Sequence, residues 1–304
     1  MIASEVEKPI LSIVVIFHNM AREAERTLLI LGRAYQSGVS DLNYEIIAID
    51  NGSSQPLSPD QVAATGTKIR YHFLDTKAAS PVDAVNLGVE MARGEFVGVI
   101  VDGARMVTPG LIGLSLAALK GFRKPFVCAL AWHLGPDAQN VSITQGYDEK
   151  TEDALLESID WRNRGYRLFE ISTLAQSSNV GFLGGLPSEC SWLAMPRTAF
   201  LEMGGFDARF RMPGGGLVNH DFLERVANDP ATCFVVLLGE GSFHQIHGGV
   251  ATNCPLREHP GPAFQEEYVS IHGKNDTKPP LPAPYYFGSI SPQSMRFING
   301  FRDI

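Results

Sequence analysis

The sequence predicts an α/β protein with an open, mostly parallel β-sheet flanked by helices. Three features of the chain point to this class: continuous apolar runs rich in β-branched residues, helical patterns between the runs, and polar residues where the runs end. Such runs are typical of strands that are buried on both faces. Strands that alternate with helices favour right-handed parallel connections within one sheet.

The N-terminal third shows this alternation most clearly. The expected strands are Ile10–Phe17, Tyr44–Ile49, Ile69–Leu74 and Phe96–Val101, and the expected helices are Met20–Tyr35 and Pro81–Arg93. The second helix has Ser80 as a cap and Gly94 as its stop. Residues 10–101 therefore predict a repeated strand–helix–strand unit.

The middle of the chain is harder to interpret. The expected elements are a helix over Leu111–Leu119, strands over Phe126–Trp132, Cys190–Met195 and Thr232–Leu238, and helices over Thr198–Met203 and Asn219–Ala227. Residues 133–190 are polar and mixed, and they predict no regular element.

From about Pro255 the chain is rich in proline, which predicts an extended arm. Its aromatic anchors are expected to be Tyr285, Tyr286 and Phe287. We therefore expect one domain and one arm. The expected domain covers residues 1–254, with halves at about 9–105 and 106–254, and the arm covers 255–304.

The composition limits the class of protein. A chain of 304 residues with 44% hydrophobic residues can form one large domain with a sizeable core. Its net charge of −8 argues against non-specific nucleic-acid binding. Four cysteines without a CxxC pair favour free thiols in a cytoplasmic protein. The first apolar run is too short for a membrane span, so we expect neither a span nor a signal peptide. Peripheral contact with a membrane stays open.

Polar residues follow three of the N-terminal strands. They are His18 and Asn19, Asp50 and Asn51, and Asp102 and Gly103. In open α/β sheets, ligands bind beyond the carboxyl ends of the strands. The sequence therefore predicts one crevice lined by these polar groups.

Four segments, in order, resemble the motifs of family 2 glycosyltransferases with the GT-A fold: SIVVIFHN, AIDNGSS, AVNLGVEMARGEFVGVIVDGA and MGGFD. The resemblance covers about Leu11–Asn253. It implies a Rossmann-like half that binds the nucleotide, fused to a half that binds the acceptor. It also implies transfer of a sugar from a nucleotide-sugar donor, with UDP favoured, to a glycan, lipid-linked or other hydroxyl acceptor, with inversion favoured. Polysaccharide biosynthesis is suggested by analogy.

By this resemblance, Asp50 accepts a hydrogen bond from the nucleotide base, with Asn51 beside it. The other residues expected around the nucleotide are Phe17, His18, Asn19, Asn86, Asp102 and Gly103. Structural roles stay open: Asp50 and Asn51 also suit a turn, and Asn19 and Asn86 also suit capping or bracing. Arg22 suits either a phosphate contact or a solvated helix face.

The family holds a divalent cation, Mg²⁺ or Mn²⁺, with an Asp-x-Asp motif. Asp102 matches its first aspartate, but Ala104 replaces the second. His244 and His247 follow a buried strand and are the expected replacement ligands, with His247 preferred. Imidazole suits Mn²⁺ or Zn²⁺ better than Mg²⁺. In the alternative, one histidine braces the loop and the other is solvated.

The resemblance places the catalytic carboxylate at the start of the helix that follows the glycines at 214–216. Asp221 is the carboxylate at this helix start, and it suits a general base. Alternatively, it complements the helix dipole and pairs with Arg225 one turn away. Glu189 and Trp192 are expected at the acceptor wall, because tryptophan commonly stacks on sugar faces.

Two other functions are weaker fits to the sequence. A nucleotidyltransferase shares α/β nucleotide binding, but FHNMAREAER is not a glycine-rich, basic phosphate loop. A catalytically reduced module that binds a nucleotide or a glycan is favoured by Ala104 and by the missing Glu-Asp pair. An NAD-dependent dehydrogenase is disfavoured because no GxGxxG follows the first strand.

Overall fold

The structure of the chain is a computed structural model that describes residues 8–66, 68–276 and 281–299. Its strands are β1 (Leu11–Phe17), β2 (Tyr44–Asn51), β3 (Ile69–Leu74), β4 (Phe96–Ile100), β5 (Arg105–Val107), β6 (Pro125–Leu134), β7 (Ser172–Leu174), β8 (Leu193–Pro196), β9 (Cys233–His244) and β10 (Tyr285–Gly288). Its α-helices are α1 (Ala21–Ile30), α2 (Pro59–Ala64), α3 (Val82–Met91), α4 (Leu111–Gly121), α5 (Gln139–Ser142), α6 (Glu149–Ser158), α7 (Arg197–Glu202), α8 (Val218–Ala227), α9 (Gly261–His272) and α10 (Arg296–Asn299).

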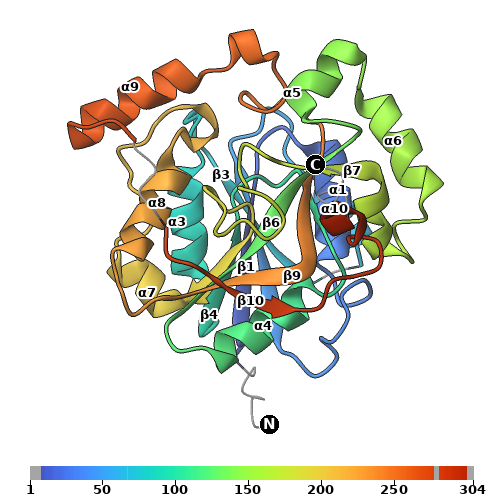
Figure 1. The fold of residues 1–304 in the computed structure, drawn as a ribbon, viewed down its shortest axis with the longest axis horizontal. Helices are drawn as coiled ribbons and strands as arrows, with labels where there is room; N and C mark the ends of the chain where they lie inside the picture. Colours follow the sequence, from blue (N-terminus) through green and yellow to red (C-terminus); the bar gives the residue numbers. More distant parts are fainter. Residues whose placement is uncertain (1–7, 67, 277–280, 300–304) are drawn as a thin grey trace.

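All described strands belong to one central sheet with the order β10-β9-β6-β8-β4-β1-β2-β3, and β5 and β7 pair with β9 and β6. The helices α3, α7 and α8 lie on one side of this sheet, and α1 and α6 lie on the other (Figure 1). The predicted α/β class with a flanked, mostly parallel sheet is confirmed.

The four N-terminal strands form the parallel part that the sequence predicts. β1 pairs with both β2 and β4, and every residue of β1 is buried. Gly88 lets α3 pack closely on β1, because an added Cβ would lie 2.3 Å from Val14 Cγ1. In this register Phe17 lies opposite Asp50, so the carboxyl ends of β1 and β2 are neighbours.

The second part of the sheet contains the antiparallel pairs. β8 lies between β4 and β6 and runs antiparallel to both. The short strand β5 follows Asp102 and pairs antiparallel with the end of β9, which places Arg105 opposite His244. Two chain segments about 140 residues apart thus meet at the same edge as β1 and β2.

The segment after Pro255 differs from the expected extended arm. It contains the twelve-residue helix α9, and β10 adds a parallel strand beside β9. The aromatic anchors explain the strand, because Tyr285 and Phe287 both pack against Phe122. Residues 277–280 and 300–304 of this segment lie outside the described residues.

The region 133–190 also contains more regular structure than its sequence predicts. Asp148 caps α6 by accepting a hydrogen bond from Thr151 N–H, and α6 carries the buried Glu152. A buried carboxylate disturbs the apolar pattern from which a helix would be predicted. Among the helices of the described ranges, none combines the length and the apolar character that crossing a bilayer requires.

Candidate active site

The loops after β1 and β2 are joined by hydrogen bonds. His18 Nδ1 donates to the carbonyl of Asn51 at 2.8 Å, and Asn19 N–H donates to Ser53 Oγ at 2.8 Å. Asn19 Oδ1 in turn accepts from Ser54 N–H and Ser54 Oγ. His18 and Asn19 themselves are exposed. The structure therefore brings these predicted residues together at one edge of the sheet.

Asp50 lies at the end of β2 and is 1% exposed. Its Oδ1 accepts from Ser53 N–H at 2.9 Å, and its Oδ2 accepts from the Tyr71 hydroxyl at 3.0 Å. Each oxygen keeps a further lone pair, because a carboxylate oxygen accepts two hydrogen bonds. The predicted turn is thus real, and it also fixes the orientation of the carboxylate.

Gly52 is required by this turn. Its φ is +70°, and an added Cβ would lie 2.1 Å from the carbonyl oxygen of Thr76. We expect Gly52→Ala to lower the free energy of unfolding by about 2 kcal/mol or more, because it adds a backbone clash to the strain of a positive φ. Denaturant unfolding measures this. Gly66→Ala is the matched control, since Gly66 has φ +67° but open space around it. Equal losses in both variants would contradict the role of the Thr76 contact.

Four predicted residues have packing or bracing contacts in the structure. Phe17 is 1% exposed and lies against Gly103, where an added Cβ would be 2.3 Å from its ring. Asn86 uses both ends of its amide on the backbone of Phe206. Asn51 Nδ2 holds the carbonyls of Ala78 and Ser80. Asn86 therefore braces the backbone at Phe206, which is the structural role considered for it.

The acceptor role expected for Trp192 is wrong. Its side chain is fully buried, and its indole N–H donates to Ser115 Oγ at 3.1 Å. The ring fills the space above Gly98 of β4, where an added Cβ would be 2.7 Å from it. A tryptophan inside the core cannot stack on a sugar. Glu189 is half-buried, and its Oε1 accepts from the Ser178 hydroxyl.

Asp102, His244 and His247 form a compact cluster, in which one ligand atom of each lies within 4.8 Å of the others. His244 Nε2 is 2.8 Å from Asp102 Oδ2 and 3.2 Å from His247 Nε2. His247 Nε2 is 3.5 Å from the same carboxylate oxygen. Asp102 comes from the loop after β4, and His244 ends β9. The predicted set of three is therefore brought together at one point.

The hydrogen bonds behind His244 fix which of its nitrogens carries the proton. Gln139 Nε2 donates to the carbonyl of His244 at 2.9 Å, so Gln139 Oε1 faces His244 Nδ1 at 2.6 Å. Asn253 Nδ2 also donates to this oxygen. An amide oxygen only accepts, which requires the hydrogen on Nδ1. Nε2 of neutral His244 therefore presents a lone pair to Asp102 and His247.

The charges of the cluster follow from burial and from the neighbours. Burial disfavours ionised Asp102, yet His247 holds its pKa well below the usual range. Burial, together with Arg105, lowers the pKa of His244 to about 4. Burial also works against protonated His247, but Asp102 raises its pKa. Asp102 is thus ionised and His244 neutral near neutral pH.

The loop that carries His247 is held from two sides. Asn253 Oδ1 accepts from the backbone N–H groups of His247, Gly248 and Gly249. On the other side, Glu152 accepts from Ile246 N–H at 2.8 Å. Burial raises the pKa of Glu152 to about 7, although this N–H and two arginines lower it.

Arg22 also holds the loop that carries His247. Its guanidinium donates to Asp153 at 2.8 Å, to Glu152 at 3.0 Å and to the carbonyl of Ile246 at 2.9 Å. It also pairs with Glu23. Both the phosphate contact and the solvated face considered for Arg22 are therefore replaced by a structural role. Gln139, Asn253 and Glu152 were not identifiable from sequence, since they lie in segments without a clear motif.

Asp221 is in a different environment from the cluster. Its side chain is 4% exposed, and Oδ2 accepts from Arg225 Nε at 2.9 Å. His272 Nε2 of α9 lies 3.1 Å from Oδ1, without the geometry of a hydrogen bond. Arg225 also donates to the carbonyls of Met203 and Gly205. The expected pair with Arg225 is confirmed, and it occupies the carboxylate that was expected to act as a base.

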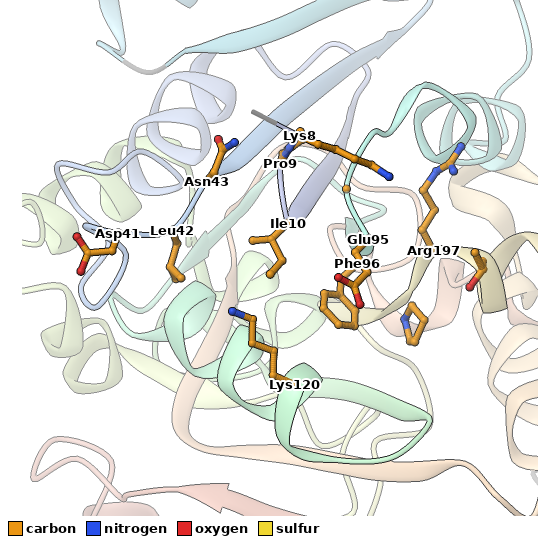
Figure 2. A pocket seen from close by; sticks show the side chains of 13 residues that line it. Lys8, Pro9, Ile10, Asp41, Leu42, Asn43, Glu95, Phe96, Lys120 and Arg197 are labelled. Atoms are coloured by element: carbon orange, nitrogen blue, oxygen red, sulfur yellow. The ribbon is translucent and has the colours of Figure 1, made fainter. Parts of the chain in front are cut away.

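A groove of about 640 Å³ lies at the opposite edge of the sheet. Figure 2 shows Ile10 before β1 and Phe96 at the start of β4, with Lys120 and Arg197 at its sides. Its lining contains none of the predicted site residues. The candidate site is therefore the opposite, carboxyl-end edge, where the Asp102 cluster and the Asp50 loop lie.

Part of the sequence and the fold are similar to those of known proteins. Residues 12–128 match the family described as glycosyl transferase family 2. The structure of S. aureus TarS aligns with a TM-score of 0.51 and 11% identity over 86% of this chain and 42% of that chain. TarS 1-349 aligns with a TM-score of 0.49 and 12% identity, over 74% of this chain and 57% of that chain. Its complex with UDP gives a TM-score of 0.48 and 12% identity, with the same coverages.

The chain thus spans about half the length of these TarS structures, between 42% and 57%. No curated protein matches its sequence. The match over residues 12–128 covers β1 to β4 and their loops, together with Asp102. Residues 12–128 are thus similar to glycosyl transferase family 2, and the fold of the chain is GT-A.

Proposed function

We propose that the chain transfers a sugar from a UDP-sugar to a hydroxyl group of a glycan or lipid-linked acceptor, in an inverting reaction. We further propose that Asp102, His244 and His247 hold a divalent cation for this reaction. The observation that carries the proposal is the pairing of His244 Nε2 with Asp102 Oδ2 at 2.8 Å.

In this pairing both atoms, His244 Nε2 and Asp102 Oδ2, are hydrogen-bond acceptors. Gln139 fixes the hydrogen of His244 on Nδ1, so Nε2 has only its lone pair to offer. The Asp102 oxygen is an acceptor as well, and the pKa of His244, about 4, disfavours an extra proton between them. A cation at this point would be attractive to both atoms, and to His247 Nε2 next to them. The residues therefore fit a metal site.

Two imidazoles and one carboxylate favour Mn²⁺ over Mg²⁺. When bound, such a cation neutralises charge on the diphosphate leaving group. The protein's part is to hold the ligands: Gln139 orients the His244 ring, and Asn253 and Glu152 fix the backbone around His247. Partners of this kind orient a ligand before the metal arrives.

For the nucleotide, we propose that Asp50 accepts a hydrogen bond from the base and that His18 and Asn19 border the ribose. The support is their position, because the hydrogen bonds between the β1 and β2 loops hold them at one edge of the sheet. On the acceptor side we propose Glu189 as the nearby carboxylate, since Asp221 is buried with Arg225.

The buried pair of Asp221 also favours a second candidate, a module that binds the nucleotide without transferring the sugar. Calorimetric titration with UDP, with and without Mn²⁺, tests the shared part of both proposals. We expect binding that requires Mn²⁺. Absence of binding to any nucleoside diphosphate would overturn both. Binding of UDP-sugars without hydrolysis or transfer, across a panel of acceptors, would favour the binding module.

A further inference from the structure

Arg105 is a largely buried arginine. It begins β5, and its side chain is 13% exposed. Its Nε is buried and has no hydrogen-bond partner among the described residues. A guanidinium has five N–H donors, and buried polar groups nearly always have partners. The buried Nε–H therefore lacks an acceptor among the described residues.

The neighbouring carboxylates leave Arg105 incompletely paired. Asp102 Oδ2 lies 3.8 Å from Arg105 Nε, beyond hydrogen-bond distance, and is turned to His244 at 2.8 Å. Glu189 attracts the guanidinium from farther away, but its Oε1 accepts from Ser178. Burial lowers the pKa of Arg105, although both carboxylates raise it. Asp102 thus balances the charge of Arg105 from a distance that leaves its Nε–H without an acceptor.

We propose that Arg105 binds a phosphate oxygen of the donor's diphosphate, beside the cation held by Asp102, His244 and His247. This inference rests on the proposed function. The planar guanidinium matches the geometry of a phosphate group and donates charge-assisted hydrogen bonds to it. Phosphate oxygens are acceptors of the kind that Arg105 lacks.

The charge of the site agrees with this role. Asp102 and Arg105 cancel each other, and both histidines are neutral when they ligate a metal. A divalent cation adds two positive charges, so the site stays positive even when Glu189 is counted, which suits a diphosphate. In an Asp-x-Asp motif the second carboxylate would lower this positive charge by one. Here Ala104 has no charge, and Arg105 follows it directly.

The alternative is that Arg105 only supports the fold by attracting Asp102. The two roles predict opposite effects on stability. Removing a cation that holds the fold together lowers the melting temperature. Removing a buried cation that lacks a close partner leaves stability unchanged or raises it, because its desolvation is no longer needed.

The experiment compares the wild type with Arg105→Met, which keeps much of the side-chain volume and removes the charge. Arg93→Met is the matched control, since Arg93 is half-exposed at the opposite edge of the sheet. Binding of UDP, uridine and inorganic pyrophosphate is measured by calorimetry at a fixed, saturating Mn²⁺ concentration. The melting temperature of each protein is measured without ligand.

We expect Arg105→Met to bind UDP and pyrophosphate roughly 10- to 100-fold more weakly. This is the loss expected when one or two charge-assisted hydrogen bonds are removed. Uridine binding stays the same, the melting temperature does not fall, and Arg105→Lys recovers part of the UDP affinity. Arg93→Met binds all three ligands like the wild type.

Two results would overturn the inference while the proposed function stands: equal UDP affinity in Arg105→Met and wild type, or an equal loss for UDP and uridine together with a lower melting temperature. If the wild type binds pyrophosphate through Arg105 but not UDP, the inference holds and the proposed donor is wrong. If the wild type binds neither probe, both are wrong.

Discussion

His244→Ala is expected to abolish Mn²⁺-dependent binding of UDP and the sugar transfer that depends on it. His244 is the central ligand, because its Nε2 lies within 3.2 Å of both Asp102 Oδ2 and His247 Nε2. Its ring is buried, and Gln139 holds it in the tautomer that offers a lone pair. Loss of a partner that merely orients a ligand lowers metal affinity about 10- to 100-fold, so loss of the ligand itself should exceed 100-fold.

Titration of Mn²⁺ into the variant, followed by UDP, measures this effect. His72→Ala is the control, since His72 is a half-buried histidine on β3, away from the cluster. Because His244→Ala leaves a space in the core, its far-UV circular dichroism and melting temperature are compared with the wild type. His247→Ala provides a second, less buried variant with the same expected direction. Unchanged Mn²⁺ affinity in both folded variants would refute the proposed metal site.

Asp221→Asn is expected to destabilise the protein while Mn²⁺ and UDP binding persist. The substitution removes the charge that compensates Arg225 in a largely buried pair. Breaking such a pair costs about 3 kcal/mol, because the remaining charge stays buried without its partner. Arg225 also holds the carbonyls of Met203 and Gly205, so its rearrangement should loosen the loop before Phe206.

Denaturant unfolding of Asp221→Asn gives this loss directly. Asp229→Asn is the control, because Asp229 pairs with Lys124 on the surface, and little change is expected there. A double change at Asp221 and Arg225 to uncharged residues should recover part of the loss. The opposite pattern, wild-type stability with transfer reduced more than about 1,000-fold, would identify Asp221 as the general base after all.

The sequence was sufficient to predict the strands and the convergence of their ends. β1, β2 and β4 are continuous apolar runs, and a parallel sheet has few ways to arrange them. The proximity of Asp102, His244 and His247 was also predictable, because Asp102 and the HxxH segment each follow a strand. The antiparallel pairing of β5 with β9 was not predictable, since the three residues of β5 are too few to show a strand pattern.

Other parts of the fold and the site could not be predicted, because they depend on packing between segments that are distant in the sequence. Trp192 is a residue type that commonly stacks on sugars. In the structure its ring packs in the core, in space that is free because Gly98 has no side chain. The proline-rich segment predicts an arm, yet its apolar residues place α9 and β10 on the domain. Gln139 and Asn253 became recognisable only as partners of His244.

The pairing of β5 with β9 also determines where the length of the chain can change. Successive residues of a strand point to opposite faces, so a one-residue shift reverses every side chain. An insertion between Asp102 and Arg105 would place another residue opposite His244 and turn the guanidinium away from the cluster. Insertions near Gly146, a turn residue with open space around it, leave this register intact. Relatives that share the site should therefore keep the short spacings of its motifs and differ in length elsewhere.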